Sequence, residues 1–148
     1  MASAPRRADA VWEGDLPTGK GTVSATTSGA FTSLPVSWAA RTEQSDGRTS
    51  PEELVAAAHA ACYCMALSHG LGEAGTPPRR LDVSATVTFQ QIEGGWKVAS
   101  SALTVQRDVP GATESGFQEA AEGAKDGCPI SGALKGNVDL SVEATLGQ

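Results

Sequence analysis

The chain has 148 residues, 40% hydrophobic side chains and a formal net charge of −6. This length predicts one domain that is large enough to bury its own hydrophobic core. The negative charge, together with basic clusters no longer than two residues, argues against a nucleic-acid partner.

Three cysteines are an odd number, and they form neither a Cys-x-x-Cys motif nor a Cys/His spacing suited to zinc. We therefore expect no disulfide framework, no metal and no cofactor. Residues 1–10 lack the apolar stretch of a signal peptide, which favours a cytoplasmic protein with reduced thiols.

Residues 1–8 are expected to form a disordered tail, and residues 9–148 a single domain. The first part of this domain is rich in β-branched residues between turn sequences, which is typical of strands joined by hairpins. Three strands are predicted, at residues 9–15, 21–27 and 34–40. A polar loop over residues 41–49 follows them.

Residues 50–68 predict the central helix of the domain. Ser50 and Glu53 have the spacing of a capping box. Between residues 54 and 67 only His59 interrupts the apolar residues, so the helix is apolar on every side and should be covered all round. The run is too short for a bilayer span, and no membrane association is expected.

The second half of the chain alternates between strand and helix patterns. Strict alternation of apolar and polar residues predicts three strands, and apolar residues at helical spacing predict two helices. After glycines that end the central helix near residues 68–75, these elements are a strand over 81–89, a strand over 99–105, a helix over 113–125, a short helix over 128–134 and a strand over 138–146. The order predicts an α+β fold with a largely antiparallel sheet.

The thiols are the candidate reactive groups. Cys62 and Cys64 lie two residues apart on a helix and point to opposite sides, so any disulfide would join one of them to Cys128. Cys128 precedes Pro129 as a helix N-cap, where free N–H groups favour a thiolate, and on this ground it is the more nucleophilic thiol. His59 shares a helix face with Cys62 and could tune it, although a buried histidine satisfied within the core is more common. Each cysteine also fits the role of a small buried hydrophobe.

Three stretches together resemble the OsmC branch of the OsmC/Ohr superfamily, collinearly over residues 11–146. They are Trp12-Glu-Gly-Asp15 with Gly19-Lys-Gly-Thr-Val-Ser24, Ser50-Pro-Glu-Glu-Leu54 with Ala57-Ala-His-Ala-Ala-Cys62, and Gly127-Cys-Pro-Ile-Ser131. The resemblance implies an OsmC-like fold around a long buried helix, in an intertwined homodimer with active sites at the subunit interface. It also implies a thiol-dependent peroxidase of stress defence that reduces organic hydroperoxides, and hydrogen peroxide less well.

By the same resemblance, Cys62 matches the peroxidatic cysteine and Cys128 the resolving one, which reverses the ranking from the helix dipole. The two would form a disulfide that an external dithiol reduces, a lipoyl protein being one candidate. Cys64 departs from the small residue that is usual in the family. It is most simply a core residue, and a role as an alternative partner of Cys128 stays open.

A cysteine buried among alanines needs a cation to form a thiolate. Arg41, at the end of the third predicted strand, matches the family's active-site arginine, and Arg48 is the alternative. Glu52 matches the glutamate that orients this arginine. Glu52 and Cys62 are about 15 Å apart along a straight helix, so either the helix bends or Arg41 and Glu52 reach the Cys62 of a second chain.

The expected site is walled by alanines, leucines and Met65, with Phe31 or Trp38 as further candidates, which favours peroxides with an organic tail. The alternative function is a small-molecule-binding protein of the same fold with inert thiols. A metal site of His59, Cys62 and Cys128 fails for want of a full ligand set.

Overall fold

The computed structural model describes residues 2–146 and divides the chain into two compact units. The first unit ends at Pro51 and the second begins at Glu52. The single-domain organisation of residues 9–148 stays a prediction.

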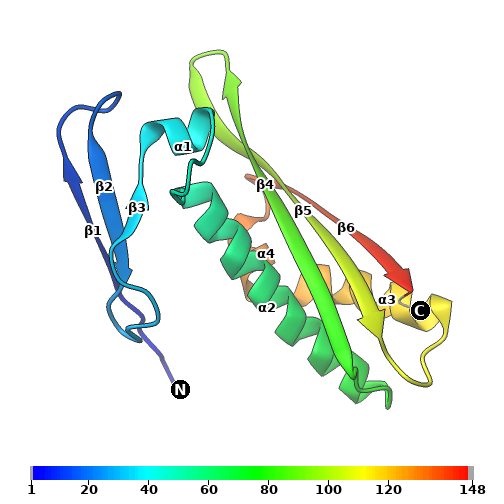
Figure 1. Ribbon diagram of the computed structural model, residues 1–148. Coiled ribbons are helices and arrows are strands. Elements are labelled where there is room, and N and C mark those ends of the chain that lie inside the picture. The colour runs from blue at the N-terminus through cyan, green and yellow to red at the C-terminus, as the bar shows by residue number, and fades with distance from the viewer. Residues whose placement is uncertain (1, 147–148) are drawn as a thin grey trace. The chain divides into compact units, whose positions relative to one another are not determined.

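The first unit is a three-stranded antiparallel sheet with the order β1-β2-β3 (Figure 1). Its strands are β1 (Ala8–Glu13), β2 (Lys20–Ala25) and β3 (Leu34–Val36). Gly21 lies under the Trp12 ring across the β1–β2 hairpin, and a Cβ there would stand 2.6 Å from Cε3 of that ring. The close approach of the tryptophan therefore requires glycine at this position.

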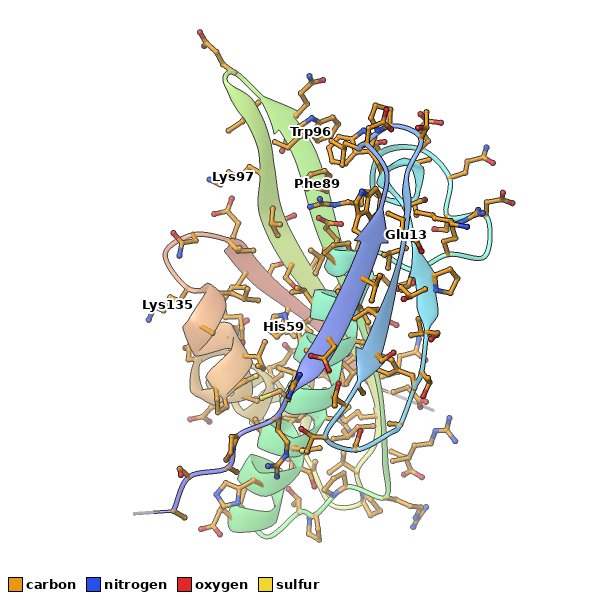
Figure 2. The ribbon with its side chains drawn as sticks, turned by 90° about the vertical axis from the view of Figure 1, so that its left-hand side faces the viewer. Glu13, His59, Phe89, Trp96, Lys97 and Lys135 are labelled. Atoms are coloured by element: carbon orange, nitrogen blue, oxygen red, sulfur yellow. The ribbon has the colours of Figure 1, made fainter. Side chains whose placement is uncertain are left out.

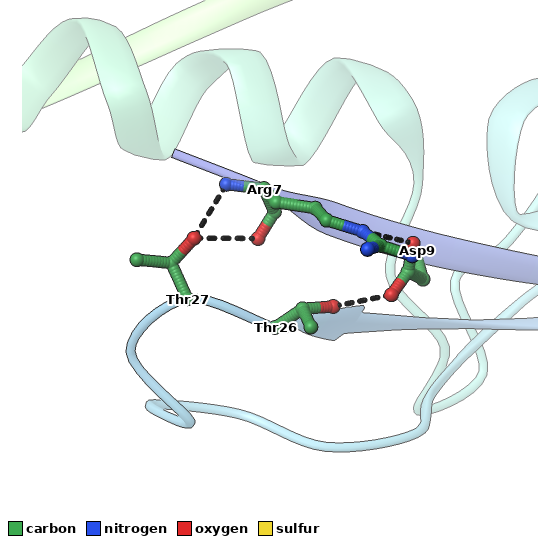
Figure 3. Close-up of polar contacts among 4 residues, drawn as sticks. All are labelled: Arg7, Asp9, Thr26 and Thr27. Carbon is green, nitrogen blue, oxygen red and sulfur yellow. Dashed lines mark hydrogen bonds and ion pairs between the residues drawn. The ribbon is translucent and has the colours of Figure 1, made fainter. Parts of the chain in front are cut away.

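The N-terminal residues are held more tightly than the sequence suggested. Arg7 and Ala8 fall in the segment expected to be disordered, yet Ala8 begins β1. The Arg7 backbone N–H donates to Thr27 Oγ1 at 2.6 Å, and Arg7 Nε donates to Asp9 Oδ1 at 3.0 Å (Figure 3). Thr26 Oγ1 donates to the other Asp9 oxygen at 2.6 Å, so the start of β1 is tied to the loop after β2.

The third strand is shorter than predicted because the chain turns into a helix. β3 ends at Val36, and α1 (Trp38–Thr42) follows where a strand was expected up to residue 40. Ser37 caps α1, with its Oγ accepting from the Ala40 N–H at 3.1 Å. A serine cap outweighed the β-propensity of the apolar residues beside it.

The second unit packs helices on one face of a three-stranded sheet. Its elements are α2 (Pro51–Glu73), β4 (Arg80–Ile92), β5 (Gly95–Asp108), α3 (Glu114–Gly127), α4 (Pro129–Leu134) and β6 (Asp139–Leu146). The sheet order is β4-β5-β6 (Figure 1). β4 and β5 form the predicted antiparallel hairpin, with Ile92 opposite Gly95 across the turn.

The strand pairings are largely antiparallel, as predicted, and the last strand is the exception. β6 pairs with β5 in parallel. A parallel neighbour needs a crossover connection, and α3 and α4 supply it by returning the chain to the same end of the sheet. The strand pattern alone predicts β6 but does not give its direction.

The core lies between the inner face of β5 and the helices α2 and α3. The alternation along β5 buries every second side chain from Ser101 to Arg107. Each element contributes to one hydrophobic cluster, whose buried members are Tyr63, Leu67, Leu71, Leu103, Val105, Val109, Phe117 and Ala124. The Tyr63 hydroxyl donates to the Ala121 carbonyl at 2.9 Å, which joins α2 to α3 inside the core.

α2 is longer than expected and ends beyond the first glycines. Gly70 and Gly72 lie within the helix, and Gly75, with φ of +82°, ends it. The Thr76 N–H donates to the Leu71 carbonyl and the Gly75 N–H to that of Gly72, the bond pattern of a Schellman motif. Gly75 ends the helix because it lies beyond the last turn, where the backbone needs a left-handed residue.

α2 is also less covered than predicted. Within the chain His59, Tyr63, Leu67 and Leu71 are buried, but Met65 is 72% exposed. With 23 residues, α2 is longer than the run that the sequence predicted, and by length and composition alone it could cross a membrane, as core helices also can. Its buried side packs on β5 and α3, as a core helix does.

Candidate active site

Cys62 lies at the wall of a groove between α2 and α3. The groove has a volume of about 600 Å³, and its lining is mostly small and apolar. The lining residues are Cys62, Met65, Ala66, His69, Gly70, Ala120, Gly123, Ala124, Gly127 and Pro129. The small side chains on both helices leave the space, so a ligand in the groove can reach the half-buried Cys62 thiol.

Cys128 lies behind Cys62 and is 1% exposed. It lies at the junction of two helices, as the C-cap of α3 and the N-cap of α4. Pro129 follows at the first position of α4. This is the predicted helix start. Pro129 lines the groove while Cys128 does not, so the two thiols differ in access.

The two thiols are neighbours, and each alters the pKa of the other. Burial raises the pKa of Cys62, the hydrogen bond to Cys128 raises it further, and the Ile130 N–H opposes this only in part. Burial also acts to raise the pKa of Cys128. However, hydrogen bonds from the Cys62 thiol, the backbone N–H and hydroxyl of Ser131 and the Ile130 N–H outweigh it and lower the pKa. Within this chain the negative charge of the pair therefore favours Cys128.

His59 is fully buried, and its ring nitrogens contact hydroxyl groups and not Cys62. Its Nδ1 lies 2.6 Å from Ser101 Oγ and its Nε2 lies 2.8 Å from Ser131 Oγ. The side chain leaves α2 toward the β4–β6 sheet (Figure 2). Burial lowers the pKa of His59, which keeps the imidazole neutral. The expected tuning of Cys62 by His59 has no direct contact to support it, while the reading as a satisfied core histidine fits these bonds.

The predicted arginines belong to the first unit and the thiols to the second. Arg41 lies in the last turn of α1, not at the end of a strand, and its guanidinium carbon is 5.5 Å from the centroid of the Trp38 ring. Arg48 is exposed, and its Nη1 is 3.6 Å from a carboxylate oxygen of Asp46. Stacking on an aromatic ring holds Arg41 in a more defined orientation than the exposed ion pair gives Arg48.

Glu52 is a buried carboxylate in the first turn of α2, with 6% of its surface exposed. It lies on the same uninterrupted helix as Cys62, ten residues earlier. At 1.5 Å per residue the two Cα atoms are about 15 Å apart along the axis. The two residues therefore cannot meet on a single copy of α2.

Cys64 faces a different part of the surface. It lines a second groove with Ser68, Arg79 and Leu81, among others, and Met65 and His69 border both grooves. Burial, and then the charge of Asp82, raise the pKa of Cys64. Cys64 is thus a half-buried thiol with little tendency to ionise.

Sequence reasoning missed the partners of His59. Ser101 and Ser131 were read only as strand and motif residues, yet both are buried and bonded to the imidazole. Ser131 carried a signal, because it stands three residues after Cys128 in the first turn of a helix. Ser101 carried none, since its role depends on where β5 crosses α2.

The chain is similar to known proteins over most of its length. The family model described as OsmC-like protein matches residues 44–143. Peroxiredoxin OsmC of Escherichia coli (strain K12) is 43% identical over 138 residues, which cover 93% of this chain and 95% of that protein. Organic hydroperoxide resistance protein OhrB of Bacillus subtilis (strain 168) is 30% identical over 96 residues, 64% of this chain and 68% of that protein.

Solved structures agree with this relationship. The crystal structure of OhrB of Bacillus subtilis matches with a TM-score of 0.72 and 26% identity, covering 94% of this chain and 98% of that one. A putative organic hydroperoxide resistance protein from Vibrio cholerae, with captopril bound in one of its active sites, matches with a TM-score of 0.73 and 26% identity over 96% of this chain and 93% of that one. The predicted OsmC-like α+β fold is confirmed.

Proposed function

The chain belongs to the family of OsmC-like proteins, and we propose that it is a cysteine-based peroxidase that reduces organic hydroperoxides to alcohols. Hydrogen peroxide is the poorer substrate. Relatives named as a peroxiredoxin and as organic hydroperoxide resistance proteins support this reading over a binding protein with inert thiols. The proposed site consists of Cys62, Cys128, Arg41 and Glu52.

The observation that carries the proposal is that two neighbouring thiols lie at one groove and that only Cys62 lines it. A peroxide in the groove meets Cys62 first, because Cys128 is almost fully enclosed. Access therefore supports Cys62 as the peroxidatic residue, even though the pKa directions favour charge on Cys128. Cys128 is near enough to act next.

The reaction proceeds in two balanced steps. The Cys62 thiolate attacks the terminal oxygen of the hydroperoxide, the O–O bond breaks, and the alkoxide leaves and takes a proton to become the alcohol. Cys62 becomes a sulfenic acid. The Cys128 thiolate then attacks the Cys62 sulfur, the S–O bond breaks, and hydroxide leaves as water while the disulfide forms. An external dithiol, such as a lipoyl protein, restores both thiols by exchange.

The first step needs a positive charge beside Cys62, because burial raises its pKa. Among the described residues that line the groove there is no lysine or arginine. We assign this role to Arg41, with Glu52 holding the guanidinium. Glu52 and Cys62 are about 15 Å apart along α2, so Glu52 and Cys62 of the same chain cannot share one site. A second chain must therefore take part.

A homodimer supplies that second chain. α2 leaves a stripe of small and apolar side chains exposed at helical spacing, formed by Ala57, Ala58, Ala61 and Met65. Small residues let another backbone approach closely, and an apolar stripe on a core helix favours burial against a partner. An intertwined dimer then brings Arg41 and Glu52 of one subunit to Cys62 of the other.

The groove favours substrates with an organic tail. Alanines, glycines and Met65 present little that binds a small hydrated peroxide, whereas an alkyl or aryl group gains by leaving water. Free thiols in all three cysteines suit a reducing compartment, and we place the enzyme in the cytoplasm.

A single-turnover titration tests the function. The reduced protein is mixed with one equivalent of cumene hydroperoxide or of hydrogen peroxide, and thiol loss and the disulfide are mapped by mass spectrometry. We expect a Cys62–Cys128 disulfide, faster with the organic peroxide. Cys62→Ser should abolish consumption, while the matched control Cys64→Ser should react like wild type. Thiols that stay reduced in excess peroxide would contradict the proposal.

Subunit complementation tests the shared site. Arg41→Ala and Cys62→Ser are each expected to be inactive as homodimers. After random subunit exchange, half of the dimers carry one intact site, so roughly a quarter of wild-type activity should return. No recovery in a sample with proven exchange would mean that Arg41 and Cys62 act within one chain, whereas an active Arg41→Ala homodimer would mean that Arg41 is not required.

A further inference from the structure

The groove beside Cys62 follows α2 and α3 for about two helical turns. On α2 its lining runs from Cys62 to His69 and Gly70, and on α3 from Ala120 to Gly127. Seven residues of an α-helix rise about 10 Å and are close to two whole turns. His69 therefore lies on the same side of α2 as the Cys62 thiol, about 10 Å further along the helix axis.

His69 is the one basic side chain among the described residues that line this groove, and none of these residues is acidic. The lining that the thiol and the imidazole share is otherwise alanine, glycine, proline and Met65. The groove thus joins a thiol to an imidazole through an apolar passage. An imidazole can donate a hydrogen bond from a ring N–H whether it is neutral or protonated, so it can bind a carboxylate in either state.

The His69 side chain is available for such a contact. It is exposed, and no hydrogen bond or ion pair in the described part of the chain uses it. The other cations nearby are Arg79 and Arg80, which border the second groove together with His69. Arg79 pairs with Asp108 at 3.1 Å. Arg80 pairs with Asp82 at 2.7 Å, so the charges of both arginines are already balanced.

We propose that His69 is a specificity-determining residue, which binds a carboxylate at the far end of a substrate whose hydroperoxide group lies at Cys62. The substrate class is the hydroperoxide of a long-chain carboxylic acid, with an apolar chain that spans about 10 Å between the two groups. The chain is buried against alanines and glycines, while the carboxylate stays at the exposed end, so no charge has to leave water completely. This inference rests on the proposed peroxidase function.

His69 takes no part in the bond-breaking step. Cys62 takes the terminal oxygen of the hydroperoxide, the O–O bond breaks, and the chain leaves as the hydroxy acid after taking up a proton. The carboxylate is unchanged by the reaction. Because its contact with His69 is the same before and during the chemical step, it lowers KM for the acid and has little effect on kcat.

Steady-state kinetics with a matched pair of substrates tests the role of His69. The probes are the 9-hydroperoxide of linoleic acid and its methyl ester, which has the same chain without the charge, both below the concentration at which micelles form. For the wild-type protein with a dithiol reductant, we expect kcat/KM to be about tenfold higher for the acid, the effect of one hydrogen bond to a charged group. His69→Leu should bring this acid-to-ester ratio close to one, mainly by raising KM for the acid.

Charge variants separate a local contact from general electrostatic attraction. His69→Lys keeps a donor at the same place and should retain the preference for the acid, whereas His69→Asp should reverse it. Lys97→Leu is the matched control, because Lys97 is an exposed cation of β5 that lines neither groove. Its acid-to-ester ratio should stay near that of wild type. Added salt should reduce the preference of the wild-type protein.

The ratio of two substrates on one protein sample cancels any partial loss of folded protein, so each variant remains informative. A wild-type ratio near one, or a ratio that His69→Leu and His69→Asp leave unchanged, would overturn the proposal. An equal fall in Lys97→Leu would overturn it too, because the preference would then come from the overall charge. Failure of the peroxidase function itself would look different, since the acid, the ester and cumene hydroperoxide would all remain unconsumed.

Discussion

Replacing Arg107 by methionine should make the protein more stable. Arg107 lies on the inner face of β5, is 6% exposed, and stacks its guanidinium 4.2 Å from the centroid of the Phe117 ring. Among the described residues, its Nε and Nη2 have no hydrogen-bond partner. A buried donor without a partner costs about 1–3 kcal/mol.

The expected gain in stability is the difference between the cost of the unpaired donors and the value of the cation–π contact. Two unpaired donors cost at least about 2 kcal/mol together, whereas the lost cation–π contact is worth about 1–2 kcal/mol. Methionine keeps a flexible apolar side chain of similar length in the same space. The net expectation is a stabilisation on the order of 1 kcal/mol, or a rise of about 2–4 °C in Tm.

Thermal and urea unfolding of wild type, Arg107→Met and Arg80→Met would measure the change in stability. Arg80→Met is the matched control, because Arg80 lies at the other side of the same sheet with its side chain 73% exposed and paired with Asp82. We expect this control to change stability by less than about 0.5 kcal/mol. If Arg107→Met unfolds at a lower temperature than wild type while Arg80→Met does not, the guanidinium is satisfied in solution and the reasoning is refuted.

Two further predictions concern glycine and histidine. Gly21→Ala should destabilise the protein by about 1–3 kcal/mol in urea unfolding, because the new Cβ would stand 2.6 Å from the Trp12 ring. Gly72→Ala, which meets open space on α2, should stabilise the protein by up to about 1 kcal/mol. Equal effects of the two variants would contradict the packing argument. His59 has a pKa below its ordinary value of 6.5 in the folded chain, so as the pH falls below 6.5 the unfolded state binds a proton that the native state does not, and the free energy of unfolding should decrease. His59→Gln should remove that part of the pH dependence, and an unchanged slope would show that His59 is not its source.

Several features of this protein could be predicted because they depend on neighbours in the sequence. The alternation over residues 81–89 predicts β4, and the Glu93-Gly94 turn predicts its hairpin with β5. Cys128 followed by Pro129 predicts the helix start at which the structure places them. Strand period, turn residues and capping residues act over a few positions, so a local pattern is sufficient to reveal them.

The tertiary structure alone decided how these elements pair and pack against one another. The parallel direction of β6 follows from the crossover through α3 and α4, and the exposed stripe on α2 follows from the single face that β5 and α3 cover. The pairing of His59 with Ser101 and Ser131 joins residues 42 and 72 positions apart. Such contacts depend on which segments the fold brings together, and no local period or propensity encodes them.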